Sequence, residues 1–347
     1  MPFEPPPDPR HRRRTAIWRW VSFAMALVLV LAVVYLIYVG YRGSQVFAAH
    51  DRAGDCRTPA SAFGWPYEAV NYDIATDGDL KAFGDQTTCP RQGEPAGTEL
   101  TASDGTRIAG WYIPAANGGG PTAATVVLAH AEGMDKSEML AWAAPLHSSY
   151  NLVMFDFRNH GQSSGDVTTL GVREVNDLRA VIGWIQQKKG AAATAVLGVG
   201  MGGAAAIDEA ASDPRAVAVI LDSTHATLAN ALQAQLQHDR FPLALPGAWS
   251  ILLGGLLRTG EDMSSADPVQ AIARYGSRPL LIVAAGHDDL VGPNDPADML
   301  TAARGDGASV ELETCPAADH GRSIETCPTE YAGWVLAFLD RAFHPAP

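Results

Sequence analysis

The residues that could do chemistry in this chain centre on a glycine-rich turn, Gly198-Val199-Gly200-Met201-Gly202-Gly203. The turn fits two patterns. In G-x-S-x-G, a serine on a sharp strand-to-helix turn attacks a carbonyl carbon, and here Gly200 stands at the serine position. In G-x-G-x-x-G, the glycines (Gly198, Gly200 and Gly203) let the backbone approach a pyrophosphate. The strands, helices and loops predicted around the turn distinguish between these two patterns.

Short apolar runs alternate with segments of helical periodicity on both sides of the turn. The predicted strands are Thr125–Leu128, Asn151–Phe155, Ala195–Val199, Ala216–Leu221 and Pro279–Ala285, and the predicted helices are Val172–Gln187, Met201–Ala211 and Tyr331–Phe343. Continuous apolar strands between helices indicate a mainly parallel sheet with helices on both faces. The region 224–267 interrupts the alternation and is predicted to be an inserted lid, which either shapes an apolar substrate pocket or packs on the domain.

Five segments in this order resemble the α/β-hydrolase superfamily, in particular its bacterial membrane-anchored esterase- or lipase-like (serine aminopeptidase-like) members. They are Val126–Gly133 as strand and oxyanion loop, Asp156–Gly165 as D-x-R-x-H-G-x-S-x-G, the Gly198–Gly203 elbow, Gly286–Asp289 and Ala318–Gly321. The resemblance covers about residues 98–343. It implies an α/β-hydrolase fold and hydrolysis of carboxylic esters or related acyl compounds, with a small to medium, partly apolar substrate.

The resemblance also implies the roles of individual residues. His320 would be the general base, a task that suits histidine because its unperturbed pKa is near neutrality. Asp289 is the preferred acid from its offset to Gly286, and Asp288 is the alternative because the segment is one residue shorter than the common pattern. The backbone amides of Met201 and Glu132 would form the oxyanion hole.

Gly200 removes the nucleophile from this arrangement. Glycine accepts the strained elbow conformation without steric cost, so the fold should survive. Loss of a triad serine costs about 2 × 10⁶ in rate. Three nearby serines, Ser163, Ser164 and Ser223, are interpreted as loop-capping residues rather than as a displaced nucleophile.

The dinucleotide interpretation has one further point in its favour, because Asp222 ends the strand that follows the turn, nineteen residues after Gly203. Against it, the turn follows the third apolar strand rather than the first. The dinucleotide interpretation also leaves the histidine-containing loops at His130, His160 and His320 unexplained. We therefore expect no cofactor and no metal.

The N-terminal region predicts a membrane anchor. Val21–Val39 is nineteen residues without a charge, which nearly spans a hydrocarbon core of about 30 Å. Residues 1–42 contain six arginines, five of them before Val21, against Glu4 and Asp8, so the positive-inside rule places the N-terminus in the cytoplasm. A cleaved signal peptide ending at Val46-Phe47-Ala48 is the alternative, although its apolar core would exceed the usual length of about 7–15 residues.

The chain is thus predicted to comprise four parts. They are a disordered basic cytoplasmic tail (1–17), a transmembrane helix (18–42), an extracytoplasmic stalk or pre-domain (43–97) and the α/β-hydrolase domain (98–347). The net charge of −13 argues against nucleic acid as a partner. All four cysteines follow the anchor, and proximity in sequence favours the disulfide pairs Cys56–Cys89 and Cys315–Cys327.

Two functional hypotheses remain open. In the first, the chain descends from esterases and is inactive or strongly impaired through a natural or engineered serine-to-glycine change at Gly200. In the second, it is a pseudoenzyme that binds a small ester or acyl ligand, or a partner, at the vacated site.

Overall fold

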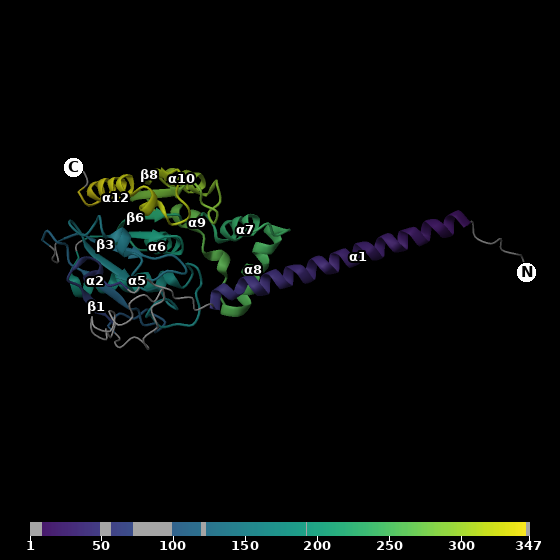
Figure 1. The fold of residues 1–347 in the computed structure, drawn as a ribbon, viewed down its shortest axis with the longest axis horizontal. Coiled ribbons are helices and arrows are strands. Elements are labelled where there is room, and N and C mark those ends of the chain that lie inside the picture. Colours follow the sequence, from purple (N-terminus) through teal and green to yellow (C-terminus); the bar gives the residue numbers. More distant parts are fainter. Residues whose placement is uncertain (1–8, 49–56, 72–98, 119–122, 192, 345–347) are drawn as a thin grey trace, which may run out of the picture.

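A computed structural model describes residues 9–48, 57–71, 99–118, 123–191 and 193–344. The Cys56–Cys89 pair and the start of the predicted tail lie outside these residues. A long N-terminal helix, α1, extends away from a body built around one sheet, and only its C-terminal part contacts that body (Figure 1). Because α1 begins at Pro9, the second half of the segment predicted to be disordered is helical.

The sheet has eight strands in the order β1-β2-β4-β3-β5-β6-β7-β8. Their bounds are Glu68–Val70 (β1), Gly110–Ile113 (β2), Thr125–Ala129 (β3), Asn151–Phe155 (β4), Thr194–Val199 (β5), Ala216–Asp222 (β6), Pro279–Ala285 (β7) and Ser309–Cys315 (β8). β2 pairs antiparallel with β1 and with β4, and every other pairing is parallel. The carboxyl ends of β3, β5, β6, β7 and β8 therefore meet at one edge, where the chemistry-bearing loops follow.

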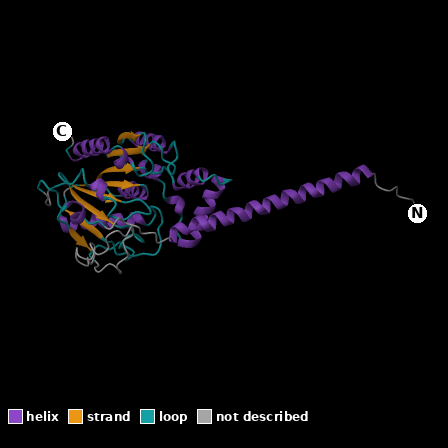
Figure 2. Cartoon of the chain, viewed as in Figure 1, coloured by secondary structure: helices purple, strands orange, loops and turns teal. Residues whose placement is uncertain are grey.

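Helices cover both faces of the sheet (Figure 2). Helices of more than one turn and the short helical turns are α1 (Pro9–Gly43), η1 (Ser44–Ala48), α2 (Pro59–Phe63), α4 (Leu140–Ala143), α5 (Glu174–Trp184), η2 (Ile185–Lys189), α6 (Met201–Ser212), α7 (Leu228–His238), α8 (Ala244–Thr259), η3 (Met263–Ser265), α9 (Pro268–Ile272), α10 (Asp295–Asp306), α11 (Ser323–Thr326) and α12 (Pro328–Phe343).

Strand residues alternate between two apolar cores, as the two-residue period of a strand requires. In β3, Val127 packs with α5, α6, α9 and α10 on one face, whereas Val126 and Leu128 pack with α4, α11 and α12 on the other. The same alternation runs through β4 to β7, which explains why these strands are apolar throughout.

A third apolar cluster lies apart from the sheet. It joins the end of α1 and η1 to the insertion between β6 and β7, through Val39, Phe47, Leu236, Ile251 and Met263 among others. Phe47 is fully buried there, and its carbonyl accepts a hydrogen bond of 2.9 Å from the Thr168 amide. The predicted lid thus contains helices α7 and α8 and packs against α1 (Figure 1).

The structure adds elements that the sequence did not predict. β1 joins the sheet beside β2, and the Asn71 side chain donates to the carbonyls of Leu100 and Ile108. Part of the predicted pre-domain is therefore a strand of the main sheet. β8 was also missed, because its residues are partly exposed and alternate with charges instead of forming an apolar run.

Candidate active site

The glycine-rich turn connects β5 to α6 and has the geometry of a nucleophile elbow. Gly200 adopts φ 52° and ψ −114°, and its amide donates to the Asp222 carbonyl at 2.9 Å. The flanking glycines are required by close packing: a Cβ on Gly202 would lie 2.6 Å from the His130 carbonyl oxygen. A Cβ on Gly198 would lie 2.5 Å from the Gly203 nitrogen. The spacing of these glycines therefore follows from the sharpness of the turn.

A side chain at position 200 would face His320. A Cβ added to Gly200 would lie 3.5 Å from His320 Nε2 and 3.3 Å from the Cβ of Ala131. A side chain of two atoms there would reach the hydrogen-bond distance of about 2.6–3.2 Å that links a nucleophile to its base. Among the described residues, Nε2 of His320 has no protein partner, and the His320 side chain is 23% exposed. The imidazole is thus accessible from the side of Gly200.

The carboxylate that holds His320 is Asp288. Its two oxygens both lie 3.0 Å from His320 Nδ1. Backbone amides of Leu290 and Val291 donate to Asp288 Oδ1 at 3.0 and 2.8 Å, which fixes the carboxylate. A carboxylate on Nδ1 selects the tautomer whose Nε2 can accept a proton.

The preference for Asp289 is corrected by this geometry. The Asp289 side chain is 48% exposed, and its oxygen lies 3.5 Å from Nδ1 of His238 on α7. The loop is one residue shorter than the pattern used to choose between the two aspartates, so the offset from Gly286 favoured the residue that does not contact His320. The alternative, Asp288, is the residue that contacts His320.

The loop after β3 is tied to the end of β4 by His130. Its Nε2 accepts a hydrogen bond from the Phe157 amide at 2.9 Å, so Nδ1 carries the proton and donates to the Ala131 carbonyl at 2.7 Å. Burial lowers the pKa of His130 to about 3, so this histidine is neutral. His130 is therefore structural, and it fixes the backbone that leads from Ala131 into Glu132.

The two predicted oxyanion donors flank the vacated position. Met201 follows Gly200 and opens α6, where the first amides of a helix have no intrahelical acceptor. Glu132 follows Ala131, whose Cβ is the nearest atom to the missing Gly200 side chain. Both amides thus belong to residues adjacent to the site, as a pair of backbone oxyanion donors requires.

A buried network behind the histidine loop was not predicted. Asp222, fully buried at the end of β6, accepts hydrogen bonds from Trp142 Nε1 at 3.0 Å and the Tyr331 hydroxyl at 2.8 Å. Ser223 Oγ donates to Asp222 at 3.1 Å and accepts from the Gly321 amide at 3.0 Å. The network therefore holds the residue next to His320. The sequence signal for this network was an aspartate at the end of an apolar strand. Asp222 was considered only as the acidic residue of the dinucleotide pattern, so the network was not predicted.

The same burial argues against the dinucleotide interpretation. An aspartate that binds a ribose must present its oxygens to the ligand. Asp222 instead uses both oxygens within the protein, and burial raises the pKa of its carboxyl.

Two of the serines considered as alternative nucleophiles, Ser163 and Ser164, form hydrogen bonds with backbone groups. Ser163 is fully buried, and its Oγ donates to the Asp156 carbonyl at 2.6 Å and accepts from the Ala109 amide at 2.9 Å. Ser164 Oγ accepts from the Arg107 amide at 2.8 Å. Their hydroxyls thus cap backbone groups, in agreement with their interpretation as loop residues.

Charged residues of the D-x-R-x-H-G segment are also structural. Asp156 is fully buried and pairs with Lys136, and this ammonium lowers the pKa of the Asp156 carboxyl against the opposing effect of burial. Arg158 makes a bidentate contact with Asp177 on α5, with Nε donating to Oδ2 and a terminal guanidinium nitrogen donating to Oδ1. These pairs fix the loop after β4 to the turn that precedes α4 and to α5.

A disulfide joins Cys315, the last residue of β8, to Cys327, with Cα atoms 6.1 Å apart. This is one of the two predicted pairs, and it encloses the loop that contains Asp319 and His320. Within the described residues no group of three or more histidine, cysteine or acidic side chains could hold a metal ion.

Comparison with known proteins agrees with this fold. A model of the alpha/beta hydrolase family matches residues 126–334, which is more than half of the sequence, and the chain belongs to this family. Its elbow and histidine loop both lie within the matched residues.

The sequence relatives are themselves uncharacterized. The chain is 33% identical to the uncharacterized protein YfhR of Escherichia coli K12 over 143 residues, 38% of this chain and 49% of the relative. It is 30% identical to the uncharacterized protein Rv2307c of Mycobacterium tuberculosis over 216 residues, 60% of this chain and 68% of the relative. The match thus spans about half the length of the first of these relatives.

Among solved structures, the chain is similar to the esterase Pf2001 of Pyrococcus furiosus. The TM-score is 0.62 at 22% identity, covering 84% of this chain and 98% of the esterase. A hydrolase from Pseudomonas aeruginosa gives a TM-score of 0.52 at 22% identity, covering 69% and 97%. At these identities the likeness establishes the fold.

Proposed function

We propose that this protein is a membrane-anchored α/β-hydrolase with the acid, base and oxyanion elements of an acyl hydrolase, inactive or strongly impaired because Gly200 lacks a nucleophile. The observation that carries the proposal is the position of His320 Nε2, 3.5 Å from the place of the missing Cβ. Asp288 orients this imidazole, and the amides of Met201 and Glu132 would bind the developing oxyanion. The ligand class is a small to medium carboxylic ester or related acyl compound.

Restoration of the nucleophile tests the proposal. A fluorophosphonate probe, which reacts with activated serines, should leave the unsubstituted chain unlabelled and label a Gly200→Ser variant. His320→Ala in the variant background should abolish the labelling, since the hydroxyl then loses its base. Labelling of the unsubstituted chain that depends on His320 would show a different nucleophile and refute the proposed impairment.

The second candidate function is that of a pseudoenzyme that binds an acyl ligand or a partner without turning it over. It is favoured by the accessible Nε2 of His320, which has no partner in the described part of the chain and can donate or accept a hydrogen bond. Absence of both labelling and ester hydrolysis in a folded Gly200→Ser variant would favour this function over that of an impaired esterase.

We also propose that α1 is a retained anchor with the domain outside the cytoplasm. The segment Ile17–Ala48 is long and apolar enough to span a membrane, a criterion that a signal sequence also meets. Retention is supported by Phe47, because cleavage after Ala48 would remove this fully buried side chain from the cluster it shares with Ile251 and Met263. Carbonate-washed membranes should retain the full-length chain, whereas a shortened chain in the soluble fraction would contradict the anchor.

A further inference from the structure

The exposed apolar side chains of this protein are concentrated in two segments. Among the described residues, every large exposed hydrophobic side chain except Phe63 belongs to α1 or to the stretch 241–257, which contains most of α8. In α8, Leu245, Trp249 and Leu253 are 51%, 53% and 56% exposed. Apolar side chains gathered in this way mark a surface that contacts something other than water.

Helix α8 runs alongside α1 at very close range. A Cβ on Gly40 would lie 2.6 Å from the Ser250 carbonyl oxygen, and a Cβ on Gly254 would lie 2.7 Å from the Gly40 carbonyl oxygen. The Tyr35 hydroxyl donates to the Pro242 carbonyl at 3.0 Å, just before α8 begins. The start of α8 is therefore beside the apolar part of α1, and its end is beside the point where α1 enters the body of the protein. Small residues at such a crossing are typical of helices that pack in membranes.

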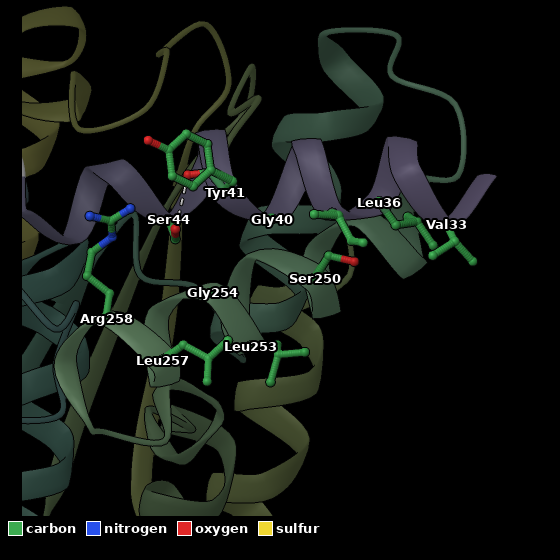
Figure 3. A pocket seen from close by; sticks show the side chains of 11 residues that line it. Val33, Leu36, Gly40, Tyr41, Ser44, Ser250, Leu253, Gly254, Leu257 and Arg258 are labelled. Atoms are coloured by element: carbon green, nitrogen blue, oxygen red, sulfur yellow. Dashed lines mark hydrogen bonds between the residues drawn. The ribbon is translucent and has the colours of Figure 1, made fainter. Parts of the chain in front are cut away.

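A groove of about 550 Å³ lies between the two helices, a size typical of small-molecule sites. Val33 and Leu36 are at one end, and Tyr41 and Arg258 are at the other, with Leu253 between them (Figure 3). The lining is thus apolar along most of its length and polar at the end nearest the body.

Arg258 is the charged residue of this groove. Its guanidinium lies 6.0 Å from the centre of the Tyr41 ring, and it makes no ion pair within the described parts of the chain. Tyr41 follows the apolar stretch of α1, where interfacial aromatic residues lie in membrane proteins. A guanidinium at this level matches the phosphates of lipid headgroups, which it binds through paired hydrogen bonds.

We propose that the groove between α1 and α8 binds one anionic membrane phospholipid. An acyl chain lies against Val33, Leu36 and Leu253, and the phosphate is held by Arg258. The inference rests on the proposed anchor, because the apolar end of the groove faces hydrocarbon only if α1 spans the bilayer. The site is separate from His320 and requires no catalytic activity.

Native mass spectrometry of the full-length chain, extracted in mild detergent and titrated with phosphatidylglycerol, tests the site. We expect one lipid per chain and weaker binding of phosphatidylcholine. Arg258→Gln should weaken the binding of phosphatidylglycerol about tenfold, as expected for loss of a charge-assisted contact. Arg304→Gln is the matched control, since Arg304 is an exposed arginine on α10, and it should change nothing.

A second pair of variants tests the apolar end. Leu253→Asp puts a charge into the groove and should abolish lipid retention, whereas Leu245→Asp, at a similarly exposed position outside the lining, should not. Equal lipid retention by all variants would refute the site. A dimer of this protein that carries no lipid would refute it as well. The same spectra separate the two proposals: an intact chain without lipid refutes the groove alone, and a chain that lacks α1 refutes the anchor and the groove together.

Discussion

The Gly200→Ser substitution should convert this protein into an active esterase. The new Cβ lies 3.5 Å from His320 Nε2, so a staggered rotamer can place the hydroxyl within reach of the base. Loss of a triad serine costs about 2 × 10⁶ in rate, and its restoration should return an increase of similar order in kcat on short acyl esters.

The substitution should also destabilise the fold. Gly200 has a φ of 52° and a ψ of −114°, and a side chain in such a sparsely populated conformation costs about 1–3 kcal/mol. The new Cβ would also lie 3.3 Å from the Cβ of Ala131, so one of the two must shift slightly. For a domain of this size, each kcal/mol lowers Tm by about 2–4 °C.

Two further variants separate these effects. Gly200→Ala introduces the same Cβ without a hydroxyl, so it should lose the same stability and gain no activity. Ala131→Gly, combined with Gly200→Ser, removes the close contact of 3.3 Å and should recover part of the lost stability. Activity is measured by hydrolysis of short p-nitrophenyl esters, and stability by thermal unfolding.

The outcome that would refute the reasoning is a folded, inactive serine variant. If Gly200→Ser unfolds at the same temperature as Gly200→Ala, yet neither hydrolyses esters nor reacts with a fluorophosphonate, the His320–Asp288 pair is not a working catalytic dyad. Equal activity in Gly200→Ala and Gly200→Ser would show instead that the introduced hydroxyl is not the nucleophile.

Three other results are expected. In the Gly200→Ser variant, Asp288→Asn should lower kcat about 10⁴-fold because the histidine then adopts the wrong tautomer, whereas Asp289→Asn should leave kcat unchanged. Equal losses of kcat in the two variants would refute the assignment of Asp288 as the acid. Replacing Cys315 and Cys327 with alanine should lower the unfolding free energy in urea by about 3 kcal/mol, because the bridge closes a short loop with a sequence separation of 12; an unchanged midpoint would contradict this. Burial, with a further contribution from the neighbouring histidine of the site, lowers the pKa of His225 from 6.5 to about 4, so the unfolded chain binds more protons between these pH values and stability falls as the pH drops through this window. The slope is about 1.4 kcal/mol per pH unit, and urea titrations of His225→Gln should show a slope smaller by that amount, an unaltered slope being the contrary result.

The central elements followed directly from the sequence. β4 and β7 have the predicted bounds, and β3, β5 and β6 differ by one residue at an end. Strands buried on both faces are continuous apolar runs, so their limits are visible in composition alone. Strands at the edges were less visible: β1 contains three residues and β8 alternates with glutamates, because an edge strand does not need an apolar side chain at every position.

The choice between Asp288 and Asp289 shows where local pattern fails. Both aspartates follow the same strand, and only the path of the loop decides which carboxylate faces His320. Amides of Leu290 and Val291 turn the loop around Asp288, a result of backbone hydrogen bonding that no offset from Gly286 encodes.

The sequence by itself determined the order of elbow, acid loop and histidine loop, the glycine at position 200, and a helix apolar enough to span a membrane. These are properties of residue type and spacing. Only the tertiary structure showed that Gly200 faces His320 and that Asp288 orients the His320 imidazole. It also placed α8 against α1, although about 200 residues of sequence separate the two helices. The physical reason is that contacts between segments distant in sequence depend on how strands pair and helices pack, which local patterns do not specify.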